Sequence, residues 1–272
     1  MCVILTIYQK RKNSQIQKDI LELYDNVKKS NPDGVGVIAF NKKEDNIHYY
    51  RDMDKSSESF GEILKKYQTI MIHFRLATSG SRNVDNVHFW QNKNWYFAHN
   101  GIVSGLVDKE QLESDSLLFF EHLIKNNFLL DNGNIKIKAI SKASNNFNLW
   151  GRFILLNDKQ KKATYFGDWY VYKINQTLII ASTKLELGTT DSILGFIFEK
   201  PVVYQENKIE SCVFSIDFVI GESKIIKKEF NFHSQSFGLT KNGYKHSLKY
   251  PYSFTPQPKE KYFNDGEEYF PI

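Results

Sequence analysis

The sequence opens with Met1-Cys2-Val3-Ile4-Leu5-Thr6-Ile7-Tyr8, a cysteine directly behind the initiator methionine and then an apolar, β-branched run. The run predicts a buried strand. If Met1 is removed, Cys2 carries both a thiol, with a pKa of about 8.5, and an α-amine, with a pKa of about 8. That amine can relay the thiol proton, as it does for other N-terminal nucleophilic residues. Taken alone, the position favours an ordinary second residue of a core strand.

Composition narrows the classes of protein that fit. A chain of 272 residues, 41% hydrophobic and 15% aromatic, can bury one large core. Its 36 basic and 31 acidic side chains give a net charge of +5, spread without a long basic block, which disfavours nucleic-acid binding. The cysteines, Cys2 and Cys212, allow no disulfide framework and no metal site built from cysteine pairs. We therefore expect no cofactor and no metal, and a reducing, cytoplasmic location.

Targeting signals are not expected either, because Lys10-Arg11-Lys12 ends the first apolar run before it could form a signal peptide or cross a membrane. The last stretch, 245–272, holds the prolines at 251, 256, 258 and 271 among aromatic and charged residues. Such a segment cannot pair regularly in a sheet. We expect one domain over 1–244 and an irregular, aromatic and proline-rich C-terminal tail over 245–272.

Hydrophobic periodicity predicts helices and strands in alternation, and then mostly strands. Ser14 with Gln17 has the form of a capping box, and Ser114 is placed to cap a later helix. Gly36 marks a place where another backbone comes close. The expected helices cover 14–29, 57–67, 115–127 and 134–143, and the expected strands cover 35–40, 47–51, 69–74, 95–98, 149–156, 163–166, 170–174, 177–182, 201–204 and 211–219. This pattern predicts an α+β fold, a four-layer αββα sandwich of two mostly antiparallel sheets.

Four further residues carry polar groups that could serve a functional site. Arg75 ends a predicted strand, where its planar fork can hold a carboxylate by two charge-assisted hydrogen bonds. Asn100 and Gly101 supply an amide donor and a backbone N–H, which could stabilise a tetrahedral oxyanion, although Asn-Gly alone is more often a turn. Asp115 begins a helix, where the helix dipole favours a carboxylate for structural reasons alone.

The order of these segments resembles a known family, the class II (type 2) glutamine amidotransferases of the N-terminal-nucleophile (Ntn) hydrolase superfamily. The resemblance covers about residues 1–185, and 186–272 carries little that matches. It rests on Met1-Cys2, Asp33-Gly34-Val35-Gly36, His73-Phe74-Arg75-Leu76-Ala77-Thr78-Ser79-Gly80, His99-Asn100-Gly101, Ser114-Asp115-Ser116 and, more loosely, Ile180-Ala181-Ser182.

The resemblance implies a role for each matching residue. Cys2 would be the nucleophile, and Asn100 and Gly101 the oxyanion donors. Arg75 would bind the α-carboxylate of glutamine and Asp115 its α-ammonium group. Two weaker matches are Thr78, in a loop that would close over the substrate, and His88, which aligns loosely with a substrate-loop position. His73 is expected to be a buried structural histidine.

The implied function is glutamine hydrolysis that releases ammonia through a γ-glutamyl thioester on Cys2. Residues 186–272 are too few for an ammonia-accepting domain, so we expect a separate acceptor synthase as partner, docking on that part of the chain. Two alternatives stay open: a hydrolase of γ-glutamyl amides or peptides, and a catalytically idle binding module. A retained Met1 would favour the idle copy, because the amine of Cys2 would then be an amide.

Overall fold

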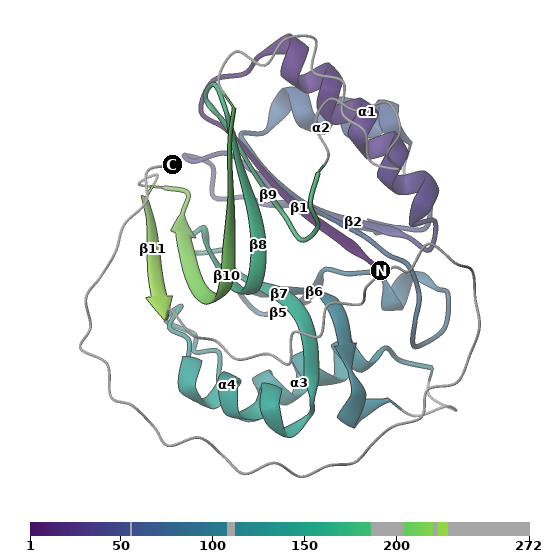
Figure 1. The fold of residues 1–272 in the computed structure, drawn as a ribbon, viewed down its shortest axis with the longest axis vertical. Helices are drawn as coiled ribbons and strands as arrows, with labels where there is room; N and C mark the ends of the chain where they lie inside the picture. The colour runs from purple at the N-terminus through teal and green to yellow at the C-terminus, as the bar shows by residue number, and fades with distance from the viewer. Residues whose placement is uncertain (55, 108–111, 186–203, 220–221, 228–272) are drawn as a thin grey trace.

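The computed structural model describes residues 1–54, 56–107, 112–185, 204–219 and 222–227 (Figure 1). The helices are α1 (Ser14–Ser30), α2 (Ser57–Lys66), α3 (Asp115–Lys125) and α4 (Ile137–Asn146), with short 3-10 turns at Val84–Asn86 and Ser104–Leu106. The strands are β1 (Val3–Gln9), β2 (Val35–Phe40), β3 (His48–Asp52), β4 (Thr69–Phe74), β5 (Trp90–Asn92), β6 (Trp95–Val103), β7 (Leu149–Asn157), β8 (Lys162–Ile174), β9 (Thr177–Ala181), β10 (Tyr204–Asp217) and β11 (Glu222–Lys227).

The strands form one curled antiparallel sheet, in the order β3-β2-β4-β1-β9-β8-β7-β6-β5, with β10 and β11 joined through β8. Strand β8 connects the two halves, because its first part pairs with β7 and its last part with β9. Gly167, at φ +96°, lies between the two parts and lets the strand change direction. The two sheets expected from the sequence are therefore halves of one sheet, and 163–166 and 170–174 belong to a single strand.

Three apolar cores lie between four layers, which confirms the predicted αββα arrangement. Helices α1 and α2 cover one half of the sheet, and α3 and α4 cover the other half (Figure 1). Alternation along β1 shows the principle: Val3 and Leu5 pack beneath α1 and α2, whereas Ile4 packs between the two halves. Strand β1 is thus buried on both faces, and it is fixed on both edges by β4 and β9.

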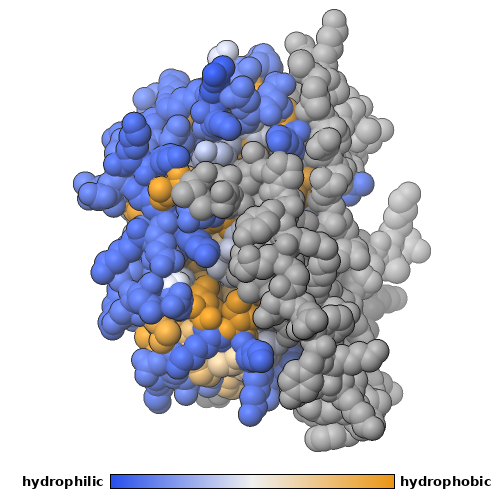
Figure 2. Space-filling view, turned by 90° about the vertical axis from the view of Figure 1, so that its left-hand side faces the viewer, coloured by the Kyte–Doolittle hydropathy of each residue, from blue (hydrophilic) through white to orange (hydrophobic). Residues whose placement is uncertain are grey.

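Among the described residues visible in Figure 2, hydrophilic side chains predominate and apolar ones gather in a limited area. No helix among the described residues is both long enough and apolar enough to span a membrane. The tail at 245–272 and most of the expected docking segment 186–272 lie outside the described residues. The predicted domain boundary after residue 244 therefore stays a prediction.

Local differences from the sequence-based expectations have simple causes. Helix α1 is capped by the side chain of Asn13, which accepts a hydrogen bond from the Ile16 amide at 3.1 Å, so Ser14 is the first helical residue and not the cap. Ser114 caps α3 as expected. A Cβ at Gly36 would overlap the carbonyl of His88, which confirms the predicted close backbone approach.

Candidate active site

Cys2 lies just before β1, half-buried beside the segment that follows β4. Its sulfur is 3.4 Å from both the amide nitrogen and the carbonyl oxygen of Leu76. Burial raises the pKa of the Cys2 thiol, while the Leu76 amide, the terminal amine and the cation of Arg75 oppose that rise. Because the pKa stays above its ordinary value, the thiol is protonated at neutral pH and needs a base to become a nucleophile.

Met1 precedes this thiol and projects outward, with 70% of its surface exposed. Its carbonyl oxygen accepts a hydrogen bond of 2.8 Å from the side-chain amide of Asn31. Asn31 is itself buried, so it holds the peptide between Met1 and Cys2 in a fixed place. With Met1 attached, the nitrogen of Cys2 is part of that peptide and carries no basic lone pair.

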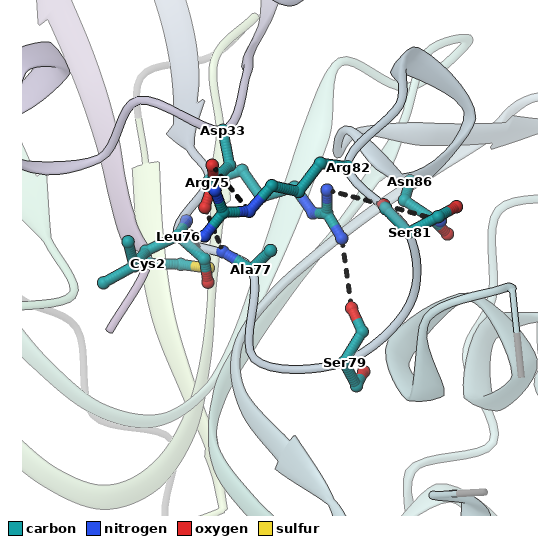
Figure 3. Close-up of polar contacts among 9 residues, drawn as sticks. All are labelled: Cys2, Asp33, Arg75, Leu76, Ala77, Ser79, Ser81, Arg82 and Asn86. Atoms are coloured by element: carbon teal, nitrogen blue, oxygen red, sulfur yellow. Dashed lines mark hydrogen bonds and ion pairs between the residues drawn. The ribbon is translucent and has the colours of Figure 1, made fainter. Parts of the chain in front are cut away.

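Arg75 follows β4 and is only 2% exposed. Both terminal nitrogens of its guanidinium bind the loop that directly follows it in the chain. Nη1 donates to the carbonyl of Ser81 and Nη2 to the carbonyl of Ser79, each at 3.0 Å (Figure 3). Burial lowers the pKa of Arg75, and the neighbouring Cys2 and Asp33 oppose the shift, so the group stays cationic. A guanidinium has five N–H donors, so these two bonds do not exhaust it.

Asp115 is the first residue of α3 and is 4% exposed. One carboxylate oxygen accepts the amide of Val103 at 2.5 Å, and the other accepts the hydroxyl of Ser79 at 2.7 Å and the amide of Ser116 at 2.9 Å. Ser79 therefore contacts both residues that are expected to bind the charged groups of the substrate: its carbonyl contacts Arg75 and its hydroxyl contacts Asp115. Ser79 thus bridges the cation and the carboxylate.

The segment 76–82, called the substrate loop below, is anchored at both ends (Figure 3). The carboxylate of Asp33 accepts the amide of Ala77 at 2.8 Å and pairs with Arg82 at 3.3 Å. The amide of Ser81 donates to the carbonyl of Leu112. Thr78 lies exposed on this loop, and its substrate contact stays a prediction.

Asn100 lies buried in β6 and is linked to the strand that carries Cys2. Its Nδ2 donates to the hydroxyl of Ser182 at 2.8 Å, and the same hydroxyl accepts the amide of Ile4 at 2.8 Å. The carbonyl of Ser182 accepts from Arg152. The second Nδ2 hydrogen of Asn100 can serve another acceptor. Gly101 follows in β6, opposite Gly151, and its donor role stays a prediction.

Three histidines pack beneath this site and carry no charge at neutral pH. The rings of His73 and His88 stack with centroids 3.8 Å apart, and the amide of His99 donates to Nδ1 of His88 at 3.1 Å. Burial lowers the pKa of His73 to about 3 and lowers the pKa values of the other two. His73 is structural, as expected. His88 is buried in the same cluster, and its expected substrate contact stays a prediction.

Sequence reasoning missed the residues that hold the site together. Asp33, Ser79 and Ser182 were quoted only within longer segments, without roles of their own. For Asp33 a signal existed, because an aspartate just before a buried strand must find donors for its carboxylate. Ser79 and Ser182 act through contacts with distant segments, which spacing along the chain does not reveal. Among the described residues, no cluster of histidine, cysteine and acidic side chains is arranged to hold a metal ion.

Comparison with known proteins agrees with this geometry. The family model "Glutamine amidotransferases class-II" matches residues 1–120. A protein of Haemophilus influenzae named "Putative glutamine amidotransferase" is 27% identical over 183 residues, covering 59% of this chain and 58% of that protein. A solved structure of glutamine phosphoribosylpyrophosphate amidotransferase from B. subtilis, complexed with ADP and GMP, shares the fold. Its TM-score is 0.54 at 15% identity, over 85% of this chain and 50% of that one.

This chain thus spans little more than half the length of these relatives. The sequence match falls on the part that carries Cys2, Arg75, Asn100 and Asp115. The shared fold covers 85% of this chain and therefore extends beyond residues 1–120. The expected resemblance is confirmed: residues 1–120 of the chain match the family model of the class II glutamine amidotransferases.

Proposed function

We propose that this protein hydrolyses the side-chain amide of glutamine with Cys2 as nucleophile and releases ammonia for a separate acceptor synthase. The observation that carries the proposal is the pair formed by Arg75 and Asp115. Both side chains are buried, they have opposite charges, and both touch Ser79. A buried cation and a buried anion that meet at one residue complement the carboxylate and ammonium groups of a free α-amino acid.

The first step requires a base beside a thiol whose pKa is raised. Met1 is exposed, so an aminopeptidase can reach it, and its removal would leave the α-amine of Cys2 next to the buried amide of Asn31. That amine takes the thiol proton, and the sulfur then attacks the amide carbon of the substrate. The same proton passes to the departing nitrogen, which leaves as ammonia, and a γ-glutamyl thioester remains on Cys2.

Charge on the tetrahedral intermediate needs donors fixed before the reaction. The remaining Nδ2 hydrogen of Asn100 and the amide of Gly101 supply them in this proposal. Asn100 is held by Ser182, which also binds the backbone of Ile4, so the donor and the nucleophile share one support. Water, activated by the same amine, then cleaves the thioester and regenerates the thiol. The reaction needs no cofactor, and a cytoplasmic setting suits a catalytic free thiol.

Two measurements test the proposal together. Intact-mass analysis before and after treatment with a diazoketone analogue of glutamine reports both the removal of Met1 and the labelling of Cys2. We expect loss of one methionine and addition of one label, with ammonia released from glutamine. Cys2→Ala should abolish labelling and activity, whereas Cys212→Ser, a matched change at the second cysteine, should preserve both. Activity of Cys2→Ala near that of the parent would rule out this mechanism.

The same measurements separate the alternatives. A hydrolase of γ-glutamyl peptides would release product from those peptides faster than ammonia from glutamine. An idle binding module would keep Met1 and take up no label.

A further inference from the structure

The substrate loop binds to Arg75 and Asp115, called the charge readers below, through two carbonyl oxygens and one hydroxyl donor. These groups stand where the carboxylate and ammonium groups of an amino acid would bind. Both arms of the Arg75 fork bind an oxygen, one from the carbonyl of Ser79 and one from the carbonyl of Ser81, each at 3.0 Å. Two oxygens on the two arms of one guanidinium reproduce the way a carboxylate is bound. Beside them, the Ser79 hydroxyl donates to Asp115 at 2.7 Å, as an ammonium group would.

We propose that Ser79 is an affinity-setting residue whose carbonyl and hydroxyl occupy the substrate's head-group subsite, so that glutamine binds only by displacing the substrate loop from Arg75 and Asp115. This inference rests on the proposed function. It assigns to Ser79 a contact that competes with the substrate, and it predicts that the protein binds glutamine more weakly than the same charge pair would if the loop did not occupy it.

The contacts of Ser79 explain why its hydroxyl matters more than other hydroxyls of the loop. It donates to the buried carboxylate of Asp115 and also accepts the first amide of α3 at 3.2 Å. A hydrogen bond to a buried charged group is among the stronger kinds in proteins. By contrast, the Ser81 hydroxyl donates to the carbonyl of Leu112 near the surface and touches neither charge reader.

Glutamine binding to catalytically silent protein tests this competition directly. Titration calorimetry would compare Cys2→Ala with the double variant Cys2→Ala/Ser79→Ala. Alanine keeps the carbonyl on Arg75 but removes the bond to Asp115, which lowers the cost of displacing the loop. Because hydrogen bonds to charged groups are the stronger kind, we expect the Kd for glutamine to fall by about tenfold. Ser79→Thr in the same background keeps a hydroxyl and should bind glutamine like the parent.

A matched control separates occupation of the subsite from general loosening of the loop. Ser81→Ala in the Cys2→Ala background removes a hydroxyl from the same loop and keeps both carbonyls on Arg75, so the Kd should change by less than about twofold. An equal gain from Ser81→Ala would overturn the inference, as would unchanged or weaker binding by Ser79→Ala. Glutamine binding by neither variant would overturn the proposed function as well, whereas binding without a gain overturns only the role of Ser79.

Discussion

Two walls of the candidate site are built in different ways. The strand wall consists of Cys2, Asn100 and Ser182, which lie on or beside β1, β6 and β9. The loop wall consists of Arg75, Ser79 and Asp115, which meet where the substrate loop reaches the start of α3. In the strand wall, side chains bond to the backbone of a buried strand, as Ser182 does to Ile4. In the loop wall, charged side chains bond to groups of a loop.

We expect this difference to separate the groups that carry out the proposed chemistry from those that bind the substrate. Groups that stabilise a transition state must be held within a fraction of an ångström, and a central strand paired on both edges provides that support. Groups that admit and retain a substrate must allow movement, which loops supply at low cost. Changes in the strand wall should therefore lower kcat, and changes in the loop wall should alter KM.

The largest effect after loss of the nucleophile is expected from Asn100→Ala. If the side chain donates to the oxyanion, its loss should lower kcat by about 10²–10³-fold with little change in KM. Steady-state kinetics of ammonia release measure both constants. A change in kcat of less than about twofold would remove Asn100 from this role.

Ser182 offers a graded version of the same test. Its hydroxyl bonds to Asn100 and touches no expected substrate atom, so Ser182→Ala should lower kcat by about tenfold, less than Asn100→Ala does. Ser182→Thr keeps the hydroxyl and should restore most of kcat. An effect of Ser182→Ala on KM alone would place Ser182 with the loop wall and break the comparison.

Low pH should lower the free energy of unfolding, because buried neutral histidines pack beneath the strand wall. Burial lowers the pKa of His73 from 6.5 to about 3, so between these values the unfolded chain binds a proton that the folded chain does not. The free energy of unfolding should be highest above pH 6.5 and should fall as the pH drops toward 3. For His73 alone the loss at pH 5 is about 2 kcal/mol.

Urea unfolding at pH 7.5 and pH 5 measures this loss. Burial lowers the pKa values of His88 and His99 too, so the full protein should lose more than His73 alone accounts for. His73→Asn should reduce the difference between the two pH values by about 2 kcal/mol, whatever it does to stability at pH 7.5. An unchanged difference would show that His73 is not held neutral.

The sequence was sufficient for the elements but not for the curvature of the sheet. Strands β2 and β4 begin and end where their apolar runs do, because each is buried along its whole length. Strand β5 was not predicted, since three residues carry too little pattern. The join between the sheet halves was missed because it depends on Gly167, and a glycine inside a strand pattern looks like a break between two strands.

The site residues divide in the same way, into those that the sequence identified and those that it did not. Arg75 and Asp115 both contact Ser79, so they meet at one place, as the family resemblance implied. His88 follows the polar stretch 75–86 and is buried against Trp90 at a centroid distance of 3.9 Å, and its substrate contact stays a prediction. Ser79 and Ser182 could not be assigned from sequence, because a serine becomes informative only when its hydrogen-bond partners are known.

The smallest effect is expected in the loop wall, from Arg75→Lys. A lysine keeps the charge but replaces the planar fork with a single ammonium, so binding of the glutamine carboxylate weakens. It also releases one of the two carbonyls that Arg75 holds, which makes the loop easier to displace and offsets part of that loss. We therefore expect KM to rise by only about fivefold, with kcat within about threefold of the parent. Arg82→Lys is the matched control, because that side chain is 71% exposed and its pairing with Asp33 does not need a fork. An unchanged KM for Arg75→Lys would remove Arg75 from carboxylate binding, and a fall in kcat as large as that from Ser182→Ala would show that Arg75 belongs to the chemistry and that the two walls are not separate in function.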